Sequence, residues 1–286
     1  MTIGGAVIHS VSSMRFLKQF AVIVPLFLVG NVTIAAVSGT FLPLFLGPAF
    51  AVAGVAAYRW IVRRTEHRDV TELARDGARP ALRRGALLGV GLFSLVIAVI
   101  ALFGGYSVEG YGSLWSALAV TGGMACAATM EELAFRGLLF RTLEERFGTY
   151  RSMAVSGALF GLLHLVNSGA TLRGAIAIAF QAGLMLAAVY AATRSLWLPI
   201  GIHFGWNVAQ GAIFGTTVSG AEDARKGLLD GVLDGPAALT GGGFGPEGSV
   251  LSVLVGLAVT VVFLRIAKRR GNVVPARRRA TTTLPA

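Results

Sequence analysis

The sequence is poor in charge and has almost no cysteine. Charged residues make up only 14% of its 286 residues, whereas a soluble domain carries about a quarter. Hydrophobic residues make up 55%, so the composition is that of a chain that folds in a lipid bilayer. The single cysteine, Cys126, lies within an apolar run. This excludes a disulfide framework and a cysteine-based metal site.

Acidic residues are also scarce, with 14 Asp and Glu against 25 Lys and Arg and a formal net charge of +11. Such an excess can indicate nucleic-acid binding, but no basic face with interleaved aromatic residues is present. Most arginines instead cluster beside apolar runs, which is typical of the cytoplasmic edges of membrane proteins. We therefore expect the lipid bilayer as a partner and no nucleic acid.

Long hydrophobic runs divide the chain into about eight segments, each near the roughly 17–25 residues that a helix needs to cross a bilayer. No internal repeat of the kind found in many transporters is present. The sequence therefore predicts an all-α, multi-pass integral membrane protein with a single membrane domain over residues 1–286. The expected spans are 19–38, 43–62, 85–104, 113–140, 152–167, 173–193, 195–215 and 248–264.

The charged connections predict the orientation of these spans. If the spans alternate in direction, the arginine-rich connection 63–84 and the basic tail 266–286 lie on the same side. The loop 216–247, in which acidic residues outnumber basic ones, lies on the other side. The positive-inside rule then predicts a cell-membrane protein with both termini in the cytoplasm, a solvated connection at 63–84 and an external loop at 216–247.

Few strongly polar residues remain inside the expected spans. A charge at mid-bilayer costs roughly 2.5–3.5 kcal/mol on insertion scales, so each such residue is a candidate for function. They are Glu131, Glu132, Arg136, His164, Gln181, His203 and Asn207. In the expected spans 113–140, 152–167 and 195–215, these residues lie roughly 13–20 Å from the cytoplasmic edge, at a rise of about 1.5 Å per residue. This common layer predicts a polar catalytic cavity between the central helices.

The local spacing of these residues suggests different tasks for the two glutamates. Glu132 and Arg136 are four residues apart on one helix face, where an ion pair offsets part of the cost of burial. Glu131 is turned about 100° away and can face another helix. His203 and Asn207 are also four apart, so they present an imidazole and an amide from one face.

Each polar residue also has a purely structural interpretation, as a buried ion pair, a packing histidine or an interhelical hydrogen bond. We assign Gln181 to such a structural role. Phe160 shares a helix face with His164, so its ring is expected to pack beside the imidazole. Pro199 lies four residues before His203 and predicts a kink or a frayed turn there.

Three short motifs, in order and on separate spans, carry a resemblance to a known family. The stretches "EELAFRG", "FGLLH" and "HFGWN" fit the patterns EExxxR, FxxxH and HxxxN. The sequence thus resembles the CPBP family, the CAAX proteases and bacteriocin-processing enzymes, also called the Abi family. The family-like catalytic core is expected over about residues 113–215, and the rest of the chain is matched by topology alone. The motif positions are Glu131, Glu132, Arg136, Phe160, His164, His203 and Asn207.

The resemblance implies an intramembrane endopeptidase that cleaves membrane-associated peptides or proteins in a cavity open to the cytosol. It implies that Glu131 and His164 activate a water molecule, and that His203 and Asn207 stabilise the oxyanion. The residue types permit this chemistry, because a carboxylate beside an imidazole can take a proton from water. An imidazole and an amide can stabilise developing negative charge in a dry site. No serine or cysteine stands beside a histidine in this layer, which disfavours a covalent nucleophile.

Two alternatives remain open at this point. Glu131, His164 and His203 could bind zinc with one position left for water, although the HExxH pattern is absent and the histidines lie on different helices. We expect no cofactor, with zinc as the alternative. The protein could also be a non-proteolytic transporter or regulator, but missing repeats and the lack of a polar relay to the outer face argue against transport.

Overall fold

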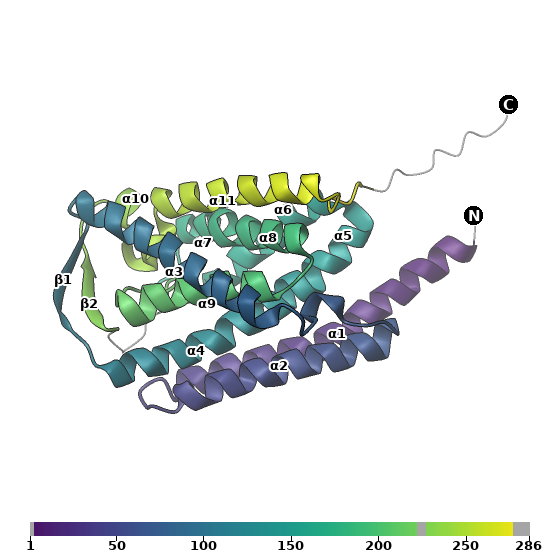
Figure 1. Cartoon of the computed structure of the whole chain (residues 1–286), viewed down its shortest axis with the longest axis horizontal. Helices are drawn as coiled ribbons and strands as arrows, with labels where there is room; N and C mark the ends of the chain where they lie inside the picture. Colours follow the sequence, from purple (N-terminus) through teal and green to yellow (C-terminus); the bar gives the residue numbers. More distant parts are fainter. Residues whose placement is uncertain (1–2, 222–226, 277–286) are drawn as a thin grey trace.

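The computed structural model describes residues 3–221 and 227–276, with side chains from Met14 onward. Residues 222–226 of the expected external loop and residues 277–286 of the expected basic tail lie outside the described residues. The chain forms a bundle of helices that run along its long axis (Figure 1). Helix α1 (Ile3–Ala36) begins and helix α11 (Val250–Arg269) ends at the same end of this bundle, which we call the terminal end.

Five described helical segments are long and apolar enough to cross a membrane. One of them, Leu172–Thr193, combines α7, a π-helical turn η4 and α8. The five segments correspond to the first, second, third, sixth and eighth expected spans. They are α1 (Ile3–Ala36, apolar over Met14–Ala36), α2 (Pro43–Glu66), α3 (Ala78–Leu102), α7–η4–α8 (Leu172–Ile178, Ala179–Leu184, Met185–Thr193) and α11 (Val250–Arg269).

The other three expected spans correspond to the helices that carry the sequence motifs. Each of them changes its helical geometry close to the motif residues. They are α4 (Leu114–Glu132) with η2 (Leu133–Phe140) and α5 (Arg141–Phe147), α6 (Thr149–Leu163) with η3 (His164–Val166), and α9 (Trp197–Asn207) with η5 (Val208–Ile213). That these three helices cross the membrane, and that the spans number eight, stays a prediction.

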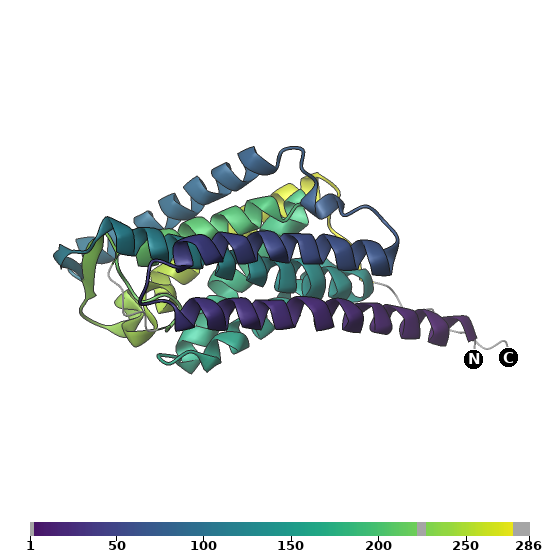
Figure 2. The ribbon, with the colours of Figure 1, turned by 90° about the horizontal axis from the view of Figure 1, so that it is seen from below.

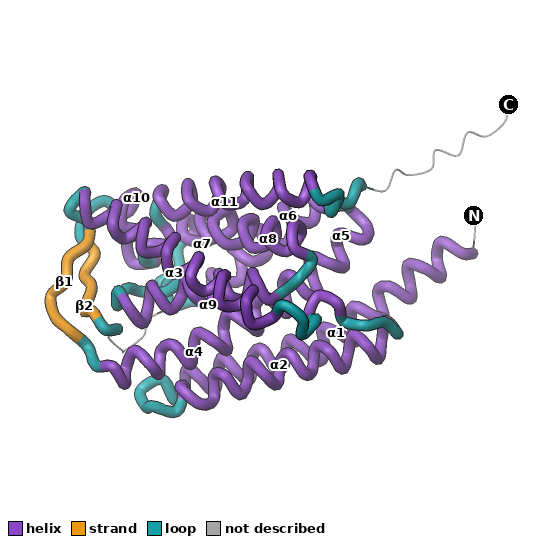
Figure 3. The backbone as a smooth tube through the Cα atoms, viewed as in Figure 1, coloured by secondary structure: helices purple, strands orange, loops and turns teal. Residues whose placement is uncertain are grey.

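A small β-sheet lies at the opposite end of the bundle, which we call the sheet end (Figure 3). Strand β1 (Tyr106–Tyr111) pairs antiparallel with β2 (Leu229–Leu233), with Tyr106 opposite Leu233 and an irregularity between Val108 and Gly110. The sequence predicted only helices, so this sheet is an addition to the expected fold. The remaining short elements are η1 (Thr71–Leu73), α10 (Ala237–Thr240), η6 (Gly242–Phe244) and η7 (Pro246–Gly248).

Glycine contacts fix how the helices pack around the site. Helices α3 and α9 touch backbone to backbone, since a Cβ on Gly205 would lie 2.1 Å from the carbonyl oxygen of Ala86. Gly205 stands between His203 and Asn207 on α9, so this close approach sets the position of both side chains. Small residues allow such approaches in membrane bundles.

Helices α1 and α2 lie side by side along one face of the bundle (Figure 2).

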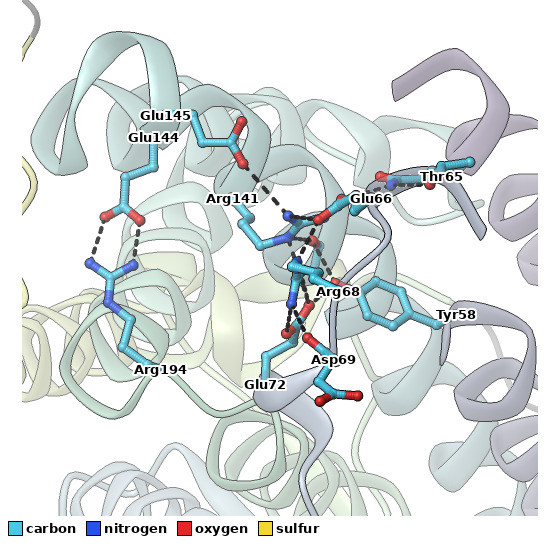
Figure 4. Close-up of polar contacts among 12 residues, drawn as sticks. Tyr58, Thr65, Glu66, Arg68, Asp69, Glu72, Arg141, Glu144, Glu145 and Arg194 are labelled. Carbon is cyan, nitrogen blue, oxygen red and sulfur yellow. Dashed lines mark hydrogen bonds and ion pairs between the residues drawn. The ribbon is translucent and has the colours of Figure 1, made fainter. Parts of the chain in front are cut away.

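Most residues of the connection between α2 and α3 are exposed or half-buried, and the expectation of a solvated segment fails only at Val70, Glu72 and Leu73, which are buried. Arg68 donates hydrogen bonds to Glu72 at 2.8 and 2.9 Å and to Glu66 at 2.6 Å (Figure 4). Arg141 of α5 donates to both oxygens of Glu66, at 2.5 and 2.9 Å. The buried carboxylates are therefore balanced by arginines from two different segments.

This polar network at the terminal end reaches the backbone of the motif helix. The hydroxyl of Tyr58 lies 2.9 Å from Glu72 Oε1 and 2.9 Å from the carbonyl oxygen of Gly137 in η2. Arg141 Nε donates to the same carbonyl at 2.9 Å. The network therefore holds the π-helical turn one residue after Arg136.

We expect replacement of Glu72 by glutamine to destabilise the protein in a pH-dependent way. Burial opposes ionisation of Glu72, but the hydrogen bonds from Arg68 and the charge of Arg141 bring its pKa below the usual value. The stabilisation is therefore present above the unfolded-state pKa of about 4.3 and is lost as the pH falls through the lower folded-state pKa. Thermal unfolding in detergent should show Glu72→Gln less stable by about 2 kcal/mol at neutral pH.

The difference between Glu72→Gln and the parent protein should shrink as the pH is lowered below about 4. The matched control is Asp69→Asn, because Asp69 is exposed and its 3.6 Å contact with Arg63 is a surface ion pair, which contributes little. A difference that stays constant from neutral to acidic pH would show that the charge of Glu72 is not what stabilises this connection.

Candidate active site

The two glutamates stand at the end of α4, where the α-helix passes into the π-helix η2. Glu132 and Arg136 are both buried, and Arg136 Nη1 donates to Glu132 Oε1 at 2.6 Å. The ion pair expected from their spacing is therefore present. It neutralises a charge that would otherwise be costly inside the bundle.

His203 of α9 lies between the two glutamates. Its Nδ1 is 2.9 Å from Glu132 Oε1, the oxygen that also accepts from Arg136. Its Nε2 is 3.8 Å from Glu131 Oε2. Because Glu132 accepts from Nδ1–H, it fixes the orientation of the imidazole and leaves Nε2 as the nitrogen that faces Glu131. Residue spacing in the sequence predicted the contact of Glu132 with Arg136 but not its contact with His203.

Arg136 is held on every side by the surrounding helices. Its Nη2 donates to the carbonyl oxygens of Ala182 at 2.8 Å and Gly183 at 3.2 Å, both in the π-helical turn η4. Its guanidinium carbon lies 4.6 Å from the ring centre of Phe160, in the geometry of a cation–π contact. π-Helical turns depart from the regular hydrogen-bond ladder and are frequent at functional sites. Here they flank the site on three helices, as η2, η4 and η5.

Phe160 packs against both histidines. Its ring centre is 4.8 Å from that of His164 and 6.1 Å from that of His203, so the expected packing with His164 is present. His164 Nδ1 lies 2.7 Å from the carbonyl oxygen of Phe160, which makes Nδ1 the donor and Nε2 the remaining acceptor. Within residues 3–221 and 227–276, no hydrogen bond or ion pair joins His164 to Glu131. A water shared by these two residues stays a prediction.

Helix α9 is continuous from Trp197 to Asn207, so the expected kink at Pro199 is not present. Pro199 falls in the first turn of the helix, where its missing N–H leaves no hydrogen bond broken. The helix departs from α-geometry only after Asn207, at η5. Asn207 is buried and lines the same small chamber as His203.

The chamber beside His203 has a volume of about 10 Å³, close to the least that holds one water molecule. From the sequence alone, Gln181 is expected to be structural, and Ser219 and Glu247 fall in the expected external loop. Only Gln181 gave a signal, as the one strongly polar residue of its span. A larger cavity open to the cytosol stays a prediction. The lining residues are Phe160, Ile178, Gln181, Ala182, Met185, Leu186, His203, Trp206, Asn207, Ser219 and Glu247.

The zinc alternative required Glu131, His164 and His203 to converge. Among the residues that the structure describes, no group of three or more His, Cys, Asp or Glu side chains is placed to hold a metal ion. As they lie, the three side chains do not form the ligand set of a metal ion. Whether the reaction needs zinc stays a prediction.

The fold and the site together define a helical membrane protein with a buried glutamate–arginine–histidine centre. Residues 113–209 match the family model of Type II CAAX prenyl endopeptidase Rce1-like proteins. This region holds all three motifs, so the match supports the resemblance to the CPBP family of membrane peptidases seen in the sequence. The family and the apolar helices indicate a membrane location and peptide substrates. No curated protein and no solved structure matches the chain.

Proposed function

We propose that the protein is an intramembrane endopeptidase that hydrolyses peptide bonds of membrane-associated peptides or proteins with a glutamate-activated water. The placement of His203 between two glutamates with different surroundings carries this proposal. Glu132 is occupied by Arg136 and by His203 Nδ1. Oε2 of each glutamate is buried without a hydrogen-bond partner among the described residues, but the ionic contact of Glu131 is only the 3.8 Å approach to His203 Nε2.

Glu131 is the proposed general base. Its side chain is 14% exposed, so it is the less enclosed of the two carboxylates. A water bound to Oε2 would give up its proton to Glu131 as its oxygen attacks the peptide carbonyl. Glu131 would then return the proton to the leaving amine. His164 Nε2, left as an acceptor by the contact of Nδ1 with Phe160, can orient the same water.

His203 and Asn207 are the proposed groups that stabilise the oxyanion. Glu132 accepts from Nδ1–H of His203, so Nε2 would donate to the oxyanion in the imidazolium form, in which both ring nitrogens carry a proton and the two glutamates balance the charge. Asn207, one turn further along α9, would add its side-chain N–H. Fixed donors of this kind are most effective in a site that excludes water, where the effective dielectric constant is low.

The test is hydrolysis by the purified protein in liposomes, after chelation and metal analysis. The substrates should be membrane-anchored peptides with and without a lipidated C-terminus, and mass spectrometry should identify the products. We expect cleavage by the metal-free protein. Cleavage only after zinc is restored would establish the zinc-dependent version, and no cleavage in either state would favour a transporter or regulator.

A further inference from the structure

The chamber beside His203 has a second wall that none of the three motifs supplies. It is formed by Ser219 and Glu247, which lie in the segment between η5 and α11. Glu247 is 2% exposed, and Ser219 Oγ donates to its Oε2 at 2.5 Å. Burying a carboxylate is costly. The burial of Glu247 beside His203 therefore suggests that this carboxylate has a role in the site.

The segments that carry Ser219 and Glu247 are held together by hydrogen bonds and close backbone contacts. We call residues 216–220 and 241–249 the outer cap. Gln210 Nε2 donates to the carbonyl oxygen of Thr217 at 2.5 Å, and Gly220 N donates to that of Phe244 at 2.9 Å. Gly245 has φ of 92°, and a Cβ there would lie 2.1 Å from the oxygen of Thr217. The two halves of the outer cap therefore touch through their backbones, which holds Ser219 and Glu247 in place.

Two further polar groups of the chamber lack partners. Gln181 is 1% exposed and Trp206 is 2% exposed. The atoms Gln181 Oε1 and Trp206 Nε1 are buried without a hydrogen-bond partner within the described part of the chain. Buried polar groups are nearly always hydrogen-bonded. An acceptor and a donor that line one chamber of about 10 Å³ call for a ligand that both donates and accepts, and water has that size and chemistry.

We propose that this chamber is a water-binding subsite in which Gln181, Trp206 and Glu247 hold one water molecule beside His203 and Asn207. Glu247 is then a positioning residue, which acts on the reaction through the bound water. The role in hydrolysis rests on the proposed endopeptidase function, whereas the water site itself does not. The outer cap then has a function, because it holds Glu247 where the bound water lies next to His203 and Asn207.

The water site can be tested without any substrate, by fluorescence of Trp206. In a protein with Trp60, Trp115 and Trp197 replaced by phenylalanine, Trp206 is the only emitter. Gln181→Leu removes the acceptor that holds the water, so we expect the emission to move to shorter wavelength. The control is Glu109→Gln, which changes an exposed carboxylate at the sheet end and should leave the emission unchanged. An unshifted emission in Gln181→Leu would overturn the water site.

The kinetic arm uses Glu247→Gln, which keeps the size of the side chain and an oxygen that can accept from Ser219. We expect kcat to fall by about 10-fold with KM unchanged, and the pH profile of kcat to change, because the charge that orients the water is gone. The liposome assay measures both, with Glu109→Gln as the control. Parental kcat and pH profile in Glu247→Gln would overturn the positioning role. If the parent cleaves no peptide, the fluorescence still decides the water site.

Discussion

Replacement of Glu131 by glutamine is expected to abolish measurable peptide hydrolysis, with kcat lower by roughly 10²–10⁴-fold. Glutamine keeps the volume of the side chain but cannot accept a proton from water. The fold should survive, because Glu131 Oε2 makes no hydrogen bond with any described residue. Its nearest ionic contact, with His203 Nε2, is 3.8 Å long. We therefore expect the variant to melt at the parental temperature or above it.

The matched control is Glu132→Gln, one residue further along the same helix. Glu132 accepts from both Arg136 and His203, so its loss should lower stability as well as activity. The liposome assay and thermal unfolding of both variants separate a chemical role from a structural one. Peptides that accumulate in cells carrying the Glu131 variant would then identify natural substrates. Full activity of Glu131→Gln would disprove the proposed general base.

The sequence predicted best what depends on a single helix. The pair between Glu132 and Arg136 follows from four-residue spacing, and the packing of Phe160 with His164 does so too. The contact between His203 and Glu132 joins two helices. It depends on how far α9 is rotated against its neighbours, and backbone contacts such as that of Gly205 set this rotation. Spacing along one helix carries no information about that angle.

Apart from the kink expected at Pro199, the features that the sequence missed depend on contacts between segments far apart in the chain. Strand β1 finds its partner β2 more than a hundred residues later, and an isolated strand of six residues has no strong local signal. In the sequence, Glu247 is one of several acidic residues of a loop. Only the folding of the outer cap brings it to the chamber. Glu72 looked solvated because nothing local shows that Arg141, which comes from α5, lies beside it.

Replacement of Arg136 by methionine is expected to lower the free energy of unfolding by about 3–5 kcal/mol, since it leaves a buried charge without its partner. Methionine fills much of the space beside Phe160. It cannot neutralise Glu132, nor donate to the carbonyl oxygens of Ala182 and Gly183. Thermal unfolding in detergent measures the loss. A variant that melts like the parent would contradict the importance of this ion pair.

The double variant Arg136→Met with Glu132→Gln separates the charge from the other contacts of Arg136. Removing both charges should recover part of the stability that Arg136→Met loses, and a double-mutant cycle gives the coupling between them. Hydrolysis should not recover, because His203 would lose the carboxylate that fixes its Nδ1. A stable but inactive double variant would show that the buried charge of Glu132 is retained to orient His203, and that Arg136 is present because that charge must be neutralised.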